Sequence, residues 1–192
     1  KQGWLKMKLR IFQIDAFTDS VFSGNPACVV PLKEWLPKKT MLNIAKENAV
    51  SETAFFIQNS HYFKLKWFTP EIEMDLCGHA TLATAHAIYS ILKLEKKEIL
   101  FKTKSGNLSV KIKNGFYSMD LPSRMPNPAK LPSNIQKSLN YIPNEVFKAR
   151  DYLLVYDSEQ KVKNIEINRQ FFDKCNINTG GVIITSKSKK CD

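Results

Sequence analysis

The sequence predicts an α+β fold in which short strands surround one strongly apolar helix. Segments with period-two alternation or short apolar runs are separated by turns marked by Gly, Asn and Pro, which is typical of strands joined by tight connections. One segment, Gly78–Leu94, is apolar on almost every face, as expected for a helix enclosed by a sheet. A proline-rich stretch at 122–128 then separates this part from a shorter remainder.

The expected elements follow in order along the first part of the chain. Lys8–Asp15 alternates with period two, and Ala27–Val30 follows the turn at Ser23-Gly24-Asn25-Pro26 as a buried strand. The other expected strands are Ala54–Ile57, Tyr62–Phe68, Glu98–Thr103, Asn107–Lys113 and Gly115–Asp120. Two helices interrupt them: Pro37–Val50, which is amphipathic, and the apolar Gly78–Leu94.

These patterns divide the chain into a helix-bearing β domain at 7–121, a linker at 122–128 and a partial second domain at 129–192. In the second domain we expect a short helix, a strand, a helical segment and a last strand. They span Asn134–Leu139, Asp151–Asp157, Asn168–Cys175 and Gly181–Thr185.

Composition narrows the class of protein. Hydrophobic residues make up 43% of the chain, which favours a folded globular protein. No apolar run approaches the roughly 20 residues that cross a bilayer, and the first residues lack the apolar core of a signal peptide. We therefore expect a cytoplasmic protein with no membrane partner.

The formal net charge of +11 raises the possibility of a nucleic-acid partner. Only four of the 29 basic residues are Arg, the residue best suited to bidentate contacts with phosphates and bases. The lysines are also spread along the chain, so a solvated lysine-rich surface and no nucleic-acid partner are expected.

The four cysteines give no sign of a metal site. Cys28, Cys77, Cys175 and Cys191 form no C-x-x-C pair, and no histidine stands at a typical zinc-ligand spacing from them. Reduced thiols fit a cytoplasmic protein better than disulfides.

The candidate site combines a carboxylate with a helix start. Gly78 and His79 open the apolar helix, and backbone N–H groups in a first helical turn have no partner inside the helix, so they can hold an anion. Glu52 stands between an apolar helix and an apolar strand. A lone acid beside such a helix start is suited to proton transfer on a small carboxylate-bearing molecule.

Each of these residues also has a purely structural interpretation. Glu52 lies between Ser51 and Thr53, where a turn or capping role is common. His79 can simply pack at the helix start, and Cys77 can be a small buried residue at a strand end. Asp15 and Asn25 can hold the first loop and the Gly24 turn, and a substrate-side role is the alternative for both.

The motifs resemble those of the phenazine-biosynthesis-like (PhzF) family, which shares its fold with diaminopimelate epimerase. The segments that carry the resemblance are Phe12-Gln13-Ile14-Asp15-Ala16-Phe17-Thr18, Ser23-Gly24-Asn25-Pro26-Ala27-Cys28-Val29-Val30, Ser51-Glu52-Thr53-Ala54-Phe55, Trp67-Phe68-Thr69-Pro70 and Asp75-Leu76-Cys77-Gly78-His79-Ala80-Thr81-Leu82-Ala83. The resemblance implies two pseudo-symmetric domains, each a mixed, mainly antiparallel sheet rolled around a central helix, and a homodimer.

The resemblance also implies a chemistry. Family members include cofactor-free isomerases that move a proton on a ring bearing a carboxylate. Glu52 matches the family's general acid/base, and Gly78 and His79 match helix-start residues beside the substrate. We therefore expect a cofactor-independent isomerase with a small carboxylate substrate, to which Asn25 and Asp15 also contribute.

Two alternatives stay open. The family's Asp-Pro-Val-Thr-Gly-Ser motif has no match here, so the second domain is expected to be incomplete and the chain to be a truncated, inactive member or an interaction protein. An amino-acid epimerase using Cys77 is the other alternative, although the epimerase pattern Cys-Gly-Asn-Gly is replaced by Cys77-Gly78-His79-Ala80.

Overall fold

The computed structural model describes residues 8–20, 22–94, 96–175 and 180–189. Contacts between Cα atoms divide the chain into two compact units, residues 1–121 and 122–192. Within the described ranges, no helix has both the length and the apolar character that a bilayer crossing requires.

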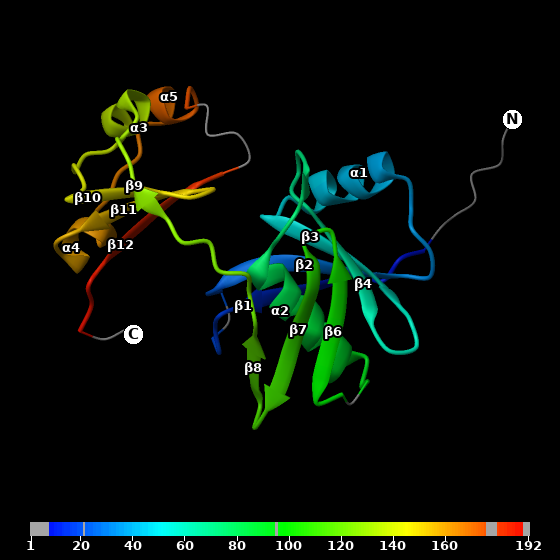
Figure 1. Ribbon diagram of the computed structural model, residues 1–192. Helices are drawn as coiled ribbons and strands as arrows, with labels where there is room; N and C mark the ends of the chain where they lie inside the picture. The colour runs from blue at the N-terminus through cyan, green and yellow to red at the C-terminus, as the bar shows by residue number, and fades with distance from the viewer. Residues whose placement is uncertain (1–7, 21, 95, 176–179, 190–192) are drawn as a thin grey trace, which may run out of the picture. The chain divides into compact units, whose positions relative to one another are not determined.

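The first unit is built on one eight-stranded sheet (Figure 1). Its strands are β1 (Phe12–Ala16), β2 (Asn25–Leu32), β3 (Glu52–Gln58), β4 (Phe63–Phe68), β5 (Glu73–Met74), β6 (Glu98–Thr103), β7 (Gly106–Lys113) and β8 (Phe116–Met119). They lie in the order β1-β2-β3-β4-β6-β7-β8, with β5 beside β4. The pairs β2–β3 and β4–β6 are parallel and the others antiparallel. The predicted mixed, mainly antiparallel sheet is confirmed.

Helix α2 (Gly78–His86) is enclosed by this curled sheet (Figure 1). Ala80, Ala83 and Ala85 are at most 1% exposed, and such small side chains let the surrounding strands approach the helix closely. Thr81 and Thr84 are also buried, and their hydroxyls donate to the carbonyls one turn back, at 2.6 and 2.7 Å. The apolar pattern of the sequence therefore identified the central helix.

The two faces of the sheet carry separate cores. Side chains alternate along a strand, so Ala54 and Phe56 of β3 pack with α2, whereas Phe55 packs with helix α1 (Lys38–Asn48). Glu52 shares the parity of Ala54 and Phe56 and therefore points to the α2 side.

The predicted helix Gly78–Leu94 is not α-helical throughout. The α-helix ends at His86 and continues as a π-helical segment, η1 (Ala87–Ile91), after which Lys93 takes a left-handed conformation with φ 56°. Apolar residues on nearly every face fit either kind of turn, so sequence periodicity does not distinguish the two.

The second unit has a four-stranded sheet in the order β12-β11-β10-β9. Its elements are β9 (Asn127–Pro128), α3 (Ser133–Ser138), β10 (Glu145–Lys148), β11 (Tyr152–Tyr156), α4 (Glu159–Lys163), α5 (Arg169–Phe172) and β12 (Val182–Ser186). The end of the predicted linker is a strand, because Asn127 and Pro128 pair with β10. β5, β10 and α4 were also not predicted, since each is short and none carries a clear apolar pattern.

Candidate functional site

Glu52 is the first residue of β3, at the end of the sheet nearest the start of α2. β2 and β3 run parallel, with Glu52 opposite Ala27, a completely buried residue. The Glu52 side chain is only 15% exposed. The next residue is fixed from the other face, where the Asn48 amide donates to the Thr53 hydroxyl at 3.0 Å. The fold thus holds the Glu52 carboxylate on the α2 side, largely out of water.

The start of α2 is not capped by a side chain. Its N-cap residue, Cys77, makes no side-chain capping hydrogen bond, and the first turn contains no acidic residue. The N–H groups of Gly78 and His79 precede the first intrahelical hydrogen bond, which Thr81 makes to the Cys77 carbonyl at 3.3 Å. Together with the helix dipole, these amides favour a negative charge at this position.

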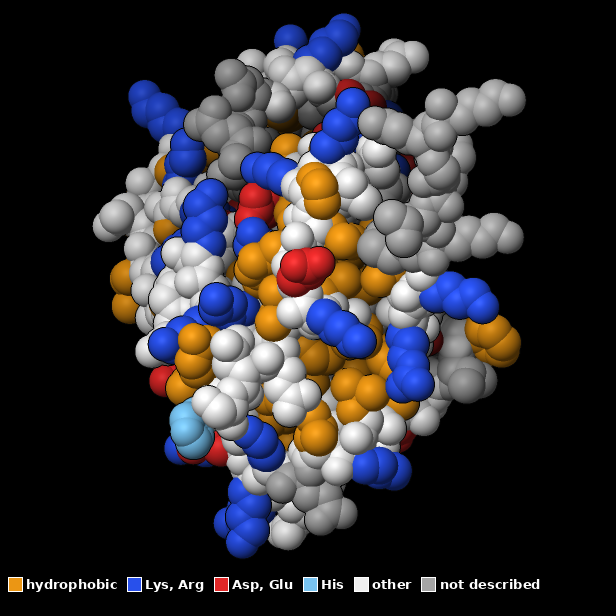
Figure 2. Space-filling view, turned by 90° about the vertical axis from the view of Figure 1, so that its right-hand side faces the viewer, with side chains coloured by type: hydrophobic (Ala, Val, Ile, Leu, Met, Phe, Trp, Pro, Cys, Tyr) orange, Lys and Arg blue, Asp and Glu red, His pale blue; other side chains and the backbone are white. Residues whose placement is uncertain are grey.

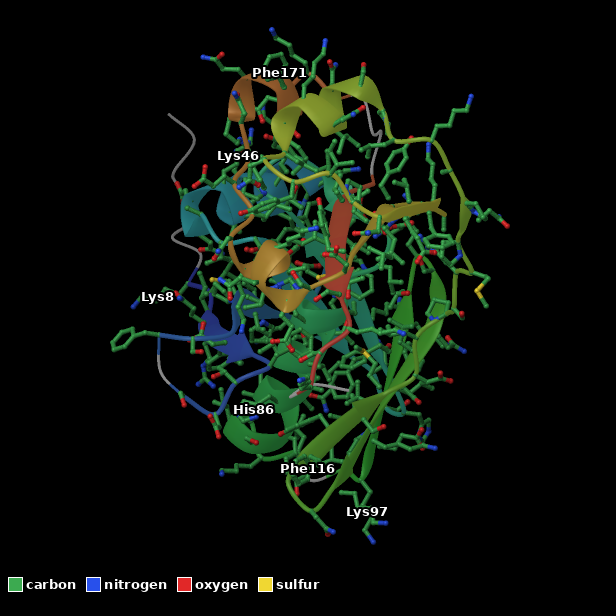
Figure 3. All side chains as sticks on the ribbon, turned by 90° about the vertical axis from the view of Figure 1, so that its left-hand side faces the viewer. Lys8, Lys46, His86, Lys97, Phe116 and Phe171 are labelled. Atoms are coloured by element: carbon green, nitrogen blue, oxygen red, sulfur yellow. The ribbon has the colours of Figure 1, made fainter. Side chains whose placement is uncertain are left out.

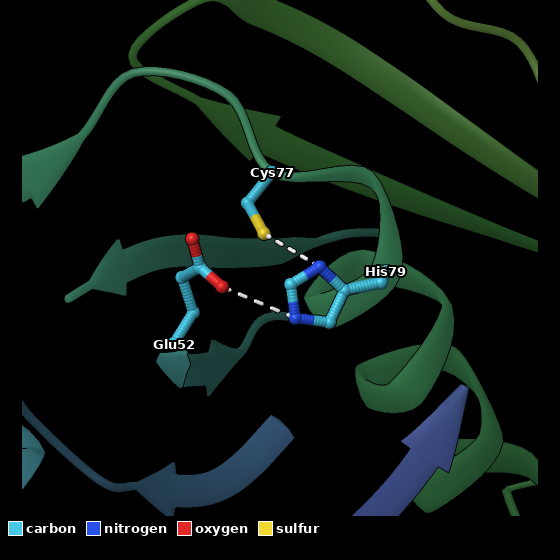
Figure 4. A group of neighbouring side chains, drawn as sticks. All are labelled: Glu52, Cys77 and His79. Atoms are coloured by element: carbon cyan, nitrogen blue, oxygen red, sulfur yellow. Dashed lines mark hydrogen bonds and ion pairs between the residues drawn. The ribbon is translucent and has the colours of Figure 1, made fainter. Parts of the chain in front are cut away.

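His79 joins the helix start to the carboxylate. Its Nε2 lies 3.1 Å from Oε2 of Glu52, and its side chain is 10% exposed (Figure 4). Both atoms are buried, and neither makes a hydrogen bond of good geometry with a described residue. On the other side of the ring, Nδ1 lies 3.5 Å from the Cys77 sulfur. The imidazole therefore stands between a carboxylate and a thiol.

The two other predicted substrate-side residues differ in their placement. Asn25 begins β2 on the same face as Ala27 and Glu52, and its Oδ1 accepts a 3.5 Å hydrogen bond from Ser51. Asp15 is exposed and pairs with Pro26 of β2, the residue before Ala27, which is the partner of Glu52. Because parity alternates along a strand, Asp15 lies on the opposite face of the sheet. The structure thus brings Asn25, but not Asp15, to the side of Glu52.

Comparison with known proteins places this arrangement in a family. The family profile PhzC-PhzF, phenazine biosynthesis-like protein, matches residues 14–186. The chain belongs to the phenazine biosynthesis-like family. An uncharacterized isomerase of Pseudomonas aeruginosa is 41% identical over 186 residues, which cover 97% of this chain and 71% of that protein.

Solved structures agree with this family assignment. A PhzF family protein from Enterococcus faecalis matches with a TM-score of 0.82 and 36% identity, over 95% of this chain and 70% of that one. A protein of P. aeruginosa described as a predicted epimerase matches with a TM-score of 0.61 at 17% identity, over 87% and 67% of the chains, which shows a shared fold. The relatives support an isomerase activity in general terms.

In this PhzF family member, the other histidines lie away from Glu52. His61 is exposed in the turn after β3. His86, at the end of α2, is labelled in Figure 3; its Nδ1 lies 3.0 Å from the Tyr117 hydroxyl, which lies 3.1 Å from that of Ser90. This network joins α2 and η1 to β8, so His86 has a structural role.

The basic residues are also distributed rather than gathered. On the face shown in Figure 2, Lys and Arg side chains are scattered among hydrophobic ones. Several of the lysines lie over aromatic rings, such as Lys66 at 4.4 Å from the Trp35 ring centroid and Lys102 at 4.0 Å from that of Tyr62. The absence of a nucleic-acid partner stays a prediction.

The contact between Cys77 and His79 was not predicted from the sequence. The two residues are separated by one position at a helix start, a spacing that by itself specifies no contact. The extended conformation of Cys77, with φ −146° and ψ 110°, places its side chain against the ring of His79. The Cys-Gly-His order was the feature of the sequence that could have indicated this contact. The contact itself depends on the backbone conformation of Cys77, which the sequence does not specify.

Proposed function

We propose that this chain is a cofactor-independent isomerase that moves a proton on a small, carboxylate-bearing and possibly cyclic metabolite, with Glu52 as the general acid/base. The observation that carries the proposal is the position of Glu52, whose shielded carboxylate lies 3.1 Å from His79 at the uncapped start of α2. Membership of a family with isomerase relatives supports the same class of reaction.

The site divides the work between backbone and side chain. The amides of Gly78 and His79 bind the carboxylate of the substrate, which fixes the position of the carbon that reacts. Glu52 removes the proton from this carbon, and the electron pair of the broken C–H bond forms a new double bond. The electrons of the former double bond take a proton at its far end, and Glu52 returns it. Atoms and charge balance without another reactant.

His79 supports the base. Its Nε2 lies within hydrogen-bond distance of the reacting carboxylate oxygen, so it can stabilise the ionised carboxylate before the first transfer and after the second. Neither Oε2 of Glu52 nor Nε2 of His79 makes a well-formed hydrogen bond to a described residue, which leaves both atoms available to the substrate.

The test is proton exchange with solvent. The purified chain is incubated in D₂O with a panel of small unsaturated carboxylates, and deuterium incorporation and double-bond migration are followed by NMR. Glu52→Gln keeps the size of the side chain but removes the base, so exchange is expected to fall at least about 100-fold. Glu98→Gln, the same change at an exposed position of β6, is the matched control and keeps exchange.

Thermal unfolding distinguishes a catalytic from a structural Glu52. If Glu52→Gln melts within a few degrees of wild type and loses exchange, the carboxylate acts in the chemistry. Equal exchange rates in wild type and Glu52→Gln refute the assignment. A wild-type chain that exchanges no carboxylate on the panel refutes the proposal that it is active by itself.

A further inference from the structure

Three metal-ligating side chains converge at the start of α2. Glu52, Cys77 and His79 each offer one ligand atom, and these atoms all lie within 4.8 Å of one another (Figure 4). They come from two places in the chain: Glu52 is the first residue of β3, whereas Cys77 is the N-cap and His79 the second residue of α2. Within the described ranges, this is the group of three His, Cys, Asp or Glu side chains whose ligand atoms are close enough to share one metal ion.

The distances suit a tetrahedral ion. Zinc–sulfur bonds of about 2.3 Å and zinc–nitrogen bonds of about 2.0–2.1 Å, at a tetrahedral angle, separate the two ligand atoms by about 3.5 Å. The Cys77 sulfur and Nδ1 of His79 are 3.5 Å apart. An ion held by the sulfur and Nδ1 cannot also bind Nε2 of the same ring, where Glu52 now lies. To become the third ligand, the Glu52 carboxylate must therefore turn toward the sulfur, which requires a change of rotamer in a flexible side chain.

A second observation points to a ligand at this place. Oε2 of Glu52, an oxygen that can turn to the ion, is buried without a well-formed hydrogen bond, and the His79 side chain is nine-tenths buried. Buried polar atoms that lack partners are costly, and they commonly mark a place where a substrate or an ion binds.

We propose that Glu52, Cys77 and His79 form a binding site for a zinc-like divalent ion. Three protein ligands leave the fourth tetrahedral position to water or a substrate oxygen. A thiolate and an imidazole select soft or borderline ions such as Zn²⁺ over Mg²⁺ and Ca²⁺. The bound ion occupies the lone pair with which Glu52 takes the substrate proton, so it inhibits the isomerase; this consequence rests on the proposed function.

Binding must also displace a proton. Cys77 has to lose its proton to become a ligand, so affinity rises with pH, and the ion releases protons into an unbuffered solution as it binds. This behaviour separates a thiolate site from loose binding to surface carboxylates, which are already ionised at neutral pH.

Cobalt(II) titration is the test, because a cobalt–thiolate bond gives a charge-transfer absorption band. The background is Cys175→Ser/Cys191→Ser, which leaves Cys77 and the buried Cys28, a residue on the opposite face of the sheet from Glu52. One cobalt ion per chain is expected to bind with the charge-transfer band. Adding Cys77→Ser is expected to abolish the band, and adding Glu52→Gln to weaken affinity at least about tenfold.

The outcomes are decisive in both directions. Absence of the band in the background, or its survival in a folded Cys77→Ser variant, overturns the site. Circular dichroism checks folding, and Cys77→Ala serves as a second variant if Cys77→Ser unfolds. The cobalt titration itself needs no substrate. Failure to bind cobalt, together with intact Glu52-dependent exchange on the carboxylate panel, overturns only this inference. Cobalt binding without Glu52-dependent exchange overturns only the proposed function.

Discussion

The carbonyl of Cys77 connects the stability of α2 to the geometry of the site. It accepts two hydrogen bonds from Thr81, one from the hydroxyl at 2.6 Å and one from the backbone N–H at 3.3 Å. Thr81→Val keeps the shape of this completely buried side chain and removes only the first bond. Thr84→Val removes the same kind of bond one turn later, to the carbonyl of Ala80 at 2.7 Å.

The two variants are expected to lose similar stability. A buried hydrogen bond contributes about 0.5–1.5 kcal/mol net, and the Cys77 carbonyl keeps its backbone partner. For a chain of this size, this corresponds to a fall in Tm of about 1–6 °C. Urea and thermal unfolding of both variants measure the loss.

Only Thr81→Val is expected to disturb the site, since Cys77 contacts the ring of His79. The chain has three histidines, so nitrogen-15 labelling of histidine gives a simple spectrum in which His61 and His86 serve as internal references. The His79 ring signals should shift in Thr81→Val and stay in place in Thr84→Val. Equal shifts in both variants, or none in Thr81→Val, would refute the idea that this carbonyl positions the site.

Three further predictions concern the core, the helix start and pH. Phe63→Ala removes a completely buried ring whose centroid lies 5.8 Å from that of Phe56, and it should lower the free energy of unfolding in urea by about 3–5 kcal/mol. The control is Phe116→Ala, at a residue that is 79% exposed, which should lower it by less than about 0.5 kcal/mol. Gly78→Ala should leave the free energy of unfolding unchanged or raise it by up to about 1 kcal/mol, because a Cβ there meets Met119 at an ordinary 3.6 Å; a large loss in thermal melting would contradict this. Burial raises the pKa of the Cys28 thiol, so as pH rises the unfolded chain loses this proton before the folded chain does. The free energy of unfolding should therefore fall as pH rises above about 8.5. The urea midpoint of Cys28→Ala should fall less over the same pH range than that of wild type, and an identical fall in both would exclude this cause.

Several features were determined by the sequence alone. The apolar residues of Gly78–Leu94 identified the helix that the sheet encloses, and period-two alternation identified most strands, because both patterns are local consequences of which side is buried. The family motifs identified the class of protein, and the family comparison confirms it. Short elements such as β10 and α4 were not predicted, since they are formed by pairing and capping rather than by an apolar pattern.

Tertiary structure decided which candidate residues meet. Glu52 and His79 are far apart in the chain, and only the register of β3 beside β2, with α2 enclosed by the sheet, places their side chains 3.1 Å apart. The register of β1 beside β2 puts Asp15 on the other face. A one-residue difference in pairing reverses every side chain of a strand, and that pairing is selected by packing across the whole sheet, so local sequence patterns do not contain it.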